Sequence, residues 1–396
     1  MNAMARAIAL LLALLIAACG AAVEPTDNPS DSSASDAVAD SPPAAQDAPP
    51  TSDSQTSDIS ADGVETQPAD TADAADPSAA DGNSTGDTPA ADTAAIADSA
   101  IAADSTIADS DTSLAPPSPL QTALTLPLWL KNGAFAQMPT HPSALVYAPK
   151  GFDPTQKLQI LVYIHGHNNC IQNVLGNLDT SCDPLKKTPI RSASHLADQL
   201  TAAAKNVLLI LPEVAFDMAS SDPGKLGQAN GFLNLLQEIL AELPPQIGKK
   251  SAQDVASVAI ASHSGGYWAA ASIATQGGVP IEQIWLLDSL YGSYPSYVQW
   301  VKASLPGLKG AANWNHRLFI VYTDGGGTLA LSQQLAAETQ LLVAADSWLH
   351  DTTTSTWKAE TYARGLLFKH SALTHHGTTL YYPQKLIETG HFTPIP

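Results

Sequence analysis

Several residue types are missing from a long stretch near the N-terminus. Residues 20–118 contain no Lys, Arg, His or aromatic side chain, yet they hold 20 of the 38 acidic residues of the 396-residue chain. A segment built mainly from Ala, Asp, Ser, Thr and Pro cannot bury enough apolar surface to offset the conformational entropy lost on folding. This composition excludes a folded domain there and predicts a disordered tether over residues 19–118, with one folded domain over 119–396.

Basic residues show no excess in the folded part either. Residues 119–396 carry 18 acidic and 17 basic side chains, so the formal charge of −20 comes from the tether. Binding to nucleic acid phosphates requires a basic face. The sequence therefore excludes nucleic acid as a partner.

The apolar run at the N-terminus is too short to span a membrane. Residues 7–18 form a run of about a dozen, whereas a membrane-spanning helix needs roughly 20. Preceded by Arg6 and followed by small residues, the run is typical of a secretory signal. Residues 15–19, Leu-Ile-Ala-Ala-Cys, resemble the lipobox of bacterial lipoproteins.

That resemblance implies a signal peptide over residues 1–18 and a lipid on Cys19, which would anchor the chain in a membrane. Gly20, rather than Asp, follows the cysteine. In Gram-negative lipoproteins this implies sorting to the outer membrane. An ordinary signal peptide with a chance cysteine is the alternative.

Cysteine is scarce, with three residues in the chain. Once Cys19 is assigned to the lipid, Cys170 and Cys182 remain. An exported chain meets an oxidising compartment, where a disulfide closing this loop would contribute roughly 3 kcal/mol. Two free thiols are the alternative, and no CxxC spacing supports a metal site.

The folded part alternates short apolar runs with amphipathic stretches. This order predicts an α/β fold with a doubly wound, mostly parallel sheet flanked by helices. Strands are expected over 144–147, 158–164, 207–211, 255–261, 283–287 and 318–322. Helices are expected over 192–204, 230–243, 266–275 and 329–345.

The most informative motif is Ser-His-Ser-Gly-Gly at residues 262–266, which joins an apolar strand directly to a helix. Such a context suits a nucleophile elbow, where a serine sits on a strained turn with small residues two positions before and after it. The domain resembles the α/β-hydrolase family over most of residues 140–396, with Ser262 replacing the first Gly of G-x-S-x-G. The resemblance implies that Ser264 is the nucleophile. A Ser-Gly-Gly turn in another doubly wound fold is the alternative.

A second motif, His-Gly-His at residues 165–167, follows the strand 158–164. In the family, a loop at this place supplies part of the oxyanion hole. The resemblance implies backbone N–H donors from Gly265 and from Gly166 or His167. Zinc binding by His165 and His167 is a weaker alternative, because side chains two apart on an extended chain point to opposite sides.

A serine nucleophile needs a histidine base and a carboxylate that fixes the tautomer of its ring. The family order is Ser, acid, His. We predict Asp288 as the acid, because it ends a strongly apolar strand, with Asp324 as the alternative. We predict His391 as the base, after a short possible strand over 384–387, with His375 and His376 as alternatives.

These residues together predict a serine hydrolase that cleaves a small-molecule or polymer ester through an acyl-enzyme and needs no cofactor. Amide hydrolysis is a less favoured activity. The alternative from another class is a catalytically inactive surface binding lipoprotein on a hydrolase scaffold. The long loop over residues 168–191 is expected to shape a substrate cleft. An aromatic series after Asp288 suits either a pocket wall or a helix face: Tyr291, Tyr294, Tyr297 and Trp300.

Overall fold

The computed structural model describes residues 118–183, 185, 188–248, 250–308, 314–353 and 364–396. The predicted signal peptide, Cys19 and the tether up to residue 117 lie outside these residues. In the part of the chain that the structure describes, no helix combines the length and apolar character needed to cross a bilayer.

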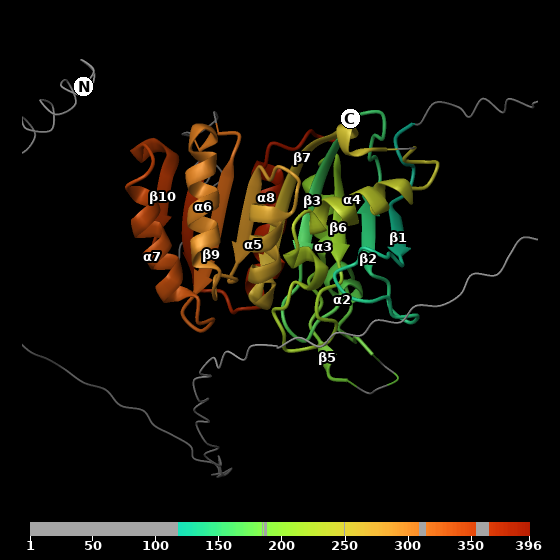
Figure 1. Cartoon of the computed structure of the whole chain (residues 1–396), viewed down its shortest axis with the longest axis horizontal. Coiled ribbons are helices and arrows are strands. Elements are labelled where there is room, and N and C mark those ends of the chain that lie inside the picture. Colours follow the sequence, from blue (N-terminus) through green and yellow to red (C-terminus); the bar gives the residue numbers. More distant parts are fainter. Residues whose placement is uncertain (1–117, 184, 186–187, 249, 309–313, 354–363) are drawn as a thin grey trace, which may run out of the picture. The chain divides into compact units, whose positions relative to one another are not determined.

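A mostly parallel sheet forms the centre of the fold, and within the described residues it has nine strands in the order β1-β2-β6-β3-β7-β8-β9-β11-β10 (Figure 1). Strand β2 runs antiparallel to both β1 and β6, and the pairs from β6 to β10 are parallel. The strands are β1 Leu124–Leu128, β2 Ala144–Ala148, β3 Leu158–Ile164, β6 Val207–Pro212, β7 Val255–His263, β8 Gln283–Leu287, β9 Arg317–Thr323, β10 Trp348–Asp351 and β11 Leu366–Ser371.

Helices cover both faces of this sheet, because successive strand residues point to opposite sides. In β3, Ile160 and Val162 belong to one apolar cluster, while Leu161 and Tyr163 belong to the other. Helices α4 Gly231–Ala241, α5 Tyr267–Gln276, α6 Tyr294–Ser304 and α7 Leu329–Gln340 contribute to the first cluster. Helices α2 Ile171–Leu175, α3 Leu196–Ala203 and α8 Gly377–Thr389 contribute to the second. The predicted doubly wound, mostly parallel sheet flanked by helices is confirmed.

The end of the chain differs from the prediction. The expected strand over 384–387 is wrong, because these residues lie inside α8, where Tyr382 and Leu386 share one buried face at helical spacing. The strand before the C-terminal helix is instead β11, whose side chains from Leu366 to Phe368 are buried. The last strand before the C-terminal helix therefore ends at residue 371 instead of residue 387.

The loop over residues 168–191 is tied to itself by the predicted Cys170–Cys182 disulfide, with the two Cα atoms 5.8 Å apart. It also carries a small antiparallel sheet of β4 Thr180–Ser181 and β5 Ile190–Arg191. The disulfide prediction is confirmed.

Candidate active site

Ser264 occupies a sharp turn between β7 and α5. Its φ angle is 51°, a left-handed backbone conformation that an L-residue other than glycine adopts at a cost of about 1–3 kcal/mol. A Cβ atom on Gly266 would lie 2.9 Å from the carbonyl oxygens of Ile164 and His165, so only glycine fits there. The close approach of strand β3 and the turn thus explains the small residue two positions after the serine.

Asp288 follows β8 at the same edge of the sheet and is fully buried. Its carboxylate accepts hydrogen bonds from the Thr323 hydroxyl at 2.7 Å, the Thr323 backbone N–H at 3.2 Å and the Thr328 hydroxyl. Burial by itself raises the pKa of Asp288, but the hydrogen bonds from His375, Thr328 and Thr323 outweigh it, so that the pKa lies below its usual value. The carboxylate is therefore held in its charged form.

His375 lies in the loop between β11 and α8, and its Nδ1 is 2.7 Å from Oδ2 of Asp288. Its ring packs against the ring of His263, with centroids 4.4 Å apart, and the His263 Nε2–H donates to the His375 carbonyl at 3.3 Å. Burial, followed by the charge of His375, lowers the pKa of His263 to about 3. A neutral His263 therefore supports the loop that carries His375 without placing a positive charge beside it.

Tyr291 lies beside this pair. Its ring meets the His375 ring edge-on, with centroids 6.3 Å apart. Burial, and then the Asp288 charge, raise the pKa of Tyr291 to about 12, so its hydroxyl stays protonated. By contrast, Tyr297 and Trp300 are buried on α6. The aromatic series thus divides between the site and the core.

The predicted base, His391, does not join this group; the histidine that contacts Asp288 is the alternative, His375. The His391 ring stacks on Trp314 with centroids 3.8 Å apart, and its carbonyl accepts a hydrogen bond from Gln159 near the start of β3. His391 therefore lies at the amino end of the parallel strands, whereas Ser264 and Asp288 follow their carboxyl ends. The cause of the error is the missed strand β11.

His376 and Asp324, the remaining candidates for the base and the acid, have partners elsewhere. His376 Nε2 contacts the carbonyl of Ala193 at 3.2 Å. Asp324 is paired with His370, at 2.9 Å between Oδ1 and Nε2, and its side chain is largely exposed. Neither candidate takes part in the contacts that join Asp288 to His375.

The loop after β3 lies directly against Ser264. A Cβ atom on Gly166 would be 2.5 Å from the Cβ atom of Ser264, and one on Gly265 would be 2.0 Å from the ring of His167. Glycine at both positions lets the two backbones approach the serine, as an oxyanion hole requires. The three predicted donor residues are thus brought together around the turn.

The His165 side chain holds this loop in place through Glu213, a partner that was not predicted from the sequence. Its Nε2 is 2.5 Å from Oε1 of Glu213, which follows β6, and its Nδ1 is 2.7 Å from the carbonyl of Gly166. Burial lowers the pKa of His165, but the charge and hydrogen bond of Glu213 outweigh it and raise the pKa. His167 Nε2 instead contacts the Ser221 hydroxyl at 2.8 Å. The two rings therefore contact separate partners.

No family model and no curated protein matches the chain. Among solved structures, it is similar to a feruloyl esterase module from Clostridium thermocellum, with 11% identity over 69% of this chain and 89% of that chain, and a TM-score of 0.44. It is also similar to an S-formylglutathione hydrolase from Agrobacterium tumefaciens, with 9% identity over 67% and 93% of the two chains and a TM-score of 0.38. A ferric enterobactin esterase from Salmonella typhimurium gives 12% identity over 69% and 59%, with a TM-score of 0.36.

Proposed function

We propose that the domain is a serine esterase with Ser264 as nucleophile, His375 as general base and Asp288 as the acid that orients His375. The observation that carries this proposal is the buried Asp288 carboxylate on Nδ1 of His375, beside a serine held at a left-handed turn. A neutral imidazole can take the proton of a serine hydroxyl only when its other nitrogen carries the hydrogen. The contact with Asp288 favours that tautomer and leaves Nε2 for the proton.

Ester hydrolysis would proceed in two steps, formation of an acyl-enzyme and its hydrolysis. Ser264 Oγ bonds to the ester carbonyl carbon while its proton passes to His375 Nε2, and the same proton then goes to the leaving alcohol as the C–O bond breaks. A water molecule then bonds to the acyl carbon while its proton passes to His375. The bond to Ser264 Oγ breaks, Ser264 takes back the proton, and the carboxylic acid is released. Backbone N–H groups of Gly265 and of Gly166 or His167 would stabilise the negative oxygen in both steps.

An activity-based probe tests the assignment of the nucleophile. A fluorophosphonate should label the wild-type protein on Ser264, and Ser264→Ala should abolish labelling while Ser296→Ala, on helix α6, should leave it intact. A folded wild-type protein that takes no label would instead favour the binding lipoprotein on a hydrolase scaffold.

We also propose that the esterase is attached to the outer membrane through a lipid on Cys19, with the acidic segment up to residue 118 as a spacer. The lipobox-like residues 15–19 and the absence of basic and aromatic side chains from residues 20–118 support this proposal. Metabolic labelling with a radioactive fatty acid should mark the wild-type chain and fail to mark Cys19→Ala. Recovery of that variant in the membrane fraction would contradict the anchor.

A further inference from the structure

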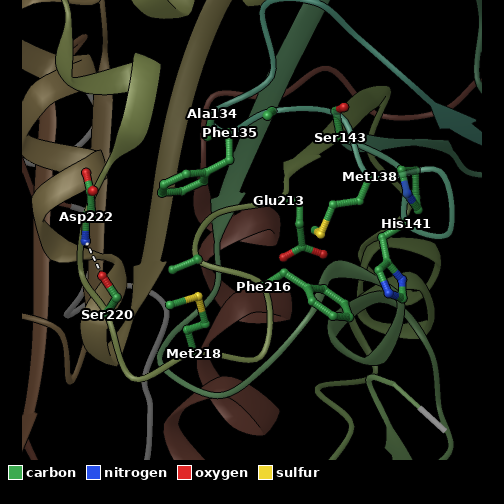
Figure 2. A pocket seen from close by; sticks show the side chains of 13 residues that line it. Ala134, Phe135, Met138, His141, Ser143, Glu213, Phe216, Met218, Ser220 and Asp222 are labelled. Atoms are coloured by element: carbon green, nitrogen blue, oxygen red, sulfur yellow. Dashed lines mark hydrogen bonds between the residues drawn. The ribbon is translucent and has the colours of Figure 1, made fainter. Parts of the chain in front are cut away.

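A cavity of about 400 Å³ lies between the loops that precede β2 and follow β6 (Figure 2). This volume is within the range of ~300–1,000 Å³ that is usual for small-molecule sites. Of the described residues that line it, none belongs to the loop over residues 168–191. Its apolar wall consists mainly of Phe135, Met138, Phe216 and Met218, with Ala134, Ala136, Pro142 and Ala215.

The loop after β3 contacts residues that line the cavity, and it also lies against the Ser264 turn. Glu213, which lines the cavity, contacts His165 in that loop, and the Asn168 N–H donates to the Met218 carbonyl at 2.8 Å. Ser221, next to the lining residues Ser220 and Asp222, contacts His167, whose ring covers Gly265. The His167 ring therefore lies between Ser221 and the backbone beside the nucleophile.

The order of the strands indicates which half of an ester faces this cavity. Ser264 follows β7, and the cavity lies by β6 and β2 on one side of it, whereas Asp288 and His375 follow β8 and β11 on the other. The leaving oxygen must lie next to His375, because that ring returns the proton to it. The acyl group is then directed away from His375, toward the cavity.

The charges around the cavity restrict what it accepts. Of the described residues that line it, none is Lys or Arg, while Glu213 and Asp222 are acidic. Glu213 already contacts His165 and accepts the Ile171 N–H at 3.2 Å. A negatively charged acyl group would meet these carboxylates, with His141 as the one histidine among the described lining residues, and burying an unpaired charge is costly.

We propose that this cavity is the acyl-binding subsite and that it selects an uncharged, apolar acyl group. The inference rests on the proposed esterase function and adds the substrate class to it. Two esters of p-nitrophenol test it, the hexanoate and the singly charged adipate, because they have acyl chains of the same number of carbons and differ in the terminal carboxylate. The wild-type protein should favour the hexanoate by at least about tenfold in kcat/KM.

Substitutions that fill the cavity provide the structural test. Met138→Trp and Met218→Trp should each lower kcat/KM for the hexanoate about tenfold and change that for the acetate less than about twofold. Met218 is 60% exposed, so its replacement leaves the core intact. Leu341→Trp, which is 86% exposed beyond α7, is the matched control and should change neither ester. Equal losses on acetate and hexanoate would overturn the subsite.

A second series varies the alcohol at constant acyl group, using phenyl and naphthyl acetates. The two filling variants should leave the ratio of these rates as in the wild type, and a change confined to this series would overturn the acyl assignment.

A binding measurement distinguishes failure of the proposed subsite from failure of the proposed esterase function. Ser264→Ala should bind methyl hexanoate, measured by calorimetry, and Ser264→Ala combined with Met218→Trp should bind it about tenfold more weakly. Binding of this kind by a wild-type protein that hydrolyses no ester would overturn the esterase but keep the apolar site. Hydrolysis without discrimination between hexanoate and adipate would overturn the subsite but keep the esterase.

Discussion

Two Asp–His pairs lie at the carboxyl edge of the same sheet, and they differ in burial rather than in length. Asp288 and His375 are 2.7 Å apart, and Asp324 and His370 are 2.9 Å apart. The Asp288 side chain is 0% exposed, whereas that of Asp324 is 76% exposed. An exposed pair contributes about 0–1 kcal/mol, because water and salt screen it. Pairing alone is therefore a weak sign of function.

The two pairs also differ in the partners of their carboxylates and imidazole rings. Asp288 has three further donors from threonines, which keep it charged, and the His375 ring lies edge-on to the ring of Tyr291. His370 has a partner at both ring nitrogens, Asp324 at Nε2 and the Thr352 carbonyl at Nδ1. Only the first pair has the arrangement that a general base requires.

The largest expected effect comes from removing the base. His375→Ala should lower kcat for p-nitrophenyl acetate by at least about a thousandfold, because Ser264 loses its proton acceptor. His370→Ala, measured in the same assay, should stay within about twofold of the wild type. Comparable losses in both variants would remove the distinction between the pairs.

Substitution of the two acids should affect kcat in the same order. Asp288→Asn should lower kcat about a hundredfold or more, because the amide no longer fixes the tautomer of His375. Asp324→Asn is the matched control, and steady-state kinetics should detect little change in it. A larger loss in Asp324→Asn than in Asp288→Asn would reverse the assignment of the acid.

A smaller effect is expected from the threonines around Asp288. Thr328→Val keeps the shape of the side chain but removes one donor to the buried carboxylate, and the loss should lower kcat about tenfold and raise the pKa of Asp288. Thr339→Val, in the buried part of α7, removes a hydroxyl that bonds only within its own helix and serves as the control. Equal activity of the two variants would show that the hydroxyl on Asp288 is dispensable.

Asp288 should also make stability depend on pH. Its folded-state pKa lies below the ordinary 3.8, so its stabilising effect is present above that value and is lost as the pH falls through the lower folded-state pKa. Urea unfolding between pH 5 and the acid limit should therefore show a steeper loss of stability in the wild type than in Asp288→Asn. Parallel curves would contradict the lowered pKa.

The smallest effect is expected at the residue that the sequence favoured as base. His391→Ala should leave kcat within about twofold, because its ring stacks on Trp314 at the other end of the strands. The thermal midpoint, rather than the rate, should report the loss of this contact.

What the sequence predicted well depends on neighbours along the chain. Ser264 and Gly166 each follow an apolar strand, and their small neighbours indicate a tight turn, so both were found from local patterns. His375 was named only as an alternative base, because its position depends on which strand precedes it in the sheet. The signal was present in the apolar run from Leu366 to Phe368, which ends shortly before His375.

Other parts of the site had no local signal at all. Glu213 binds His165 from 48 positions away, and Thr323 and Thr328 reach Asp288 from 35 and 40 positions away. These partners are set by the order of the parallel strands, which places the carboxyl ends of β6, β8 and β9 at one edge. The spacing of apolar residues along the sequence predicts the strands but not which strands lie next to each other in the sheet.

A rapid-mixing experiment with p-nitrophenyl acetate tests the central proposal most directly. The account predicts a burst of one nitrophenol per protein molecule and, after an acid quench, an acetyl group on the peptide that contains Ser264. The absence of a burst, or an acetyl group on another residue with full turnover in Ser264→Ala, would contradict it.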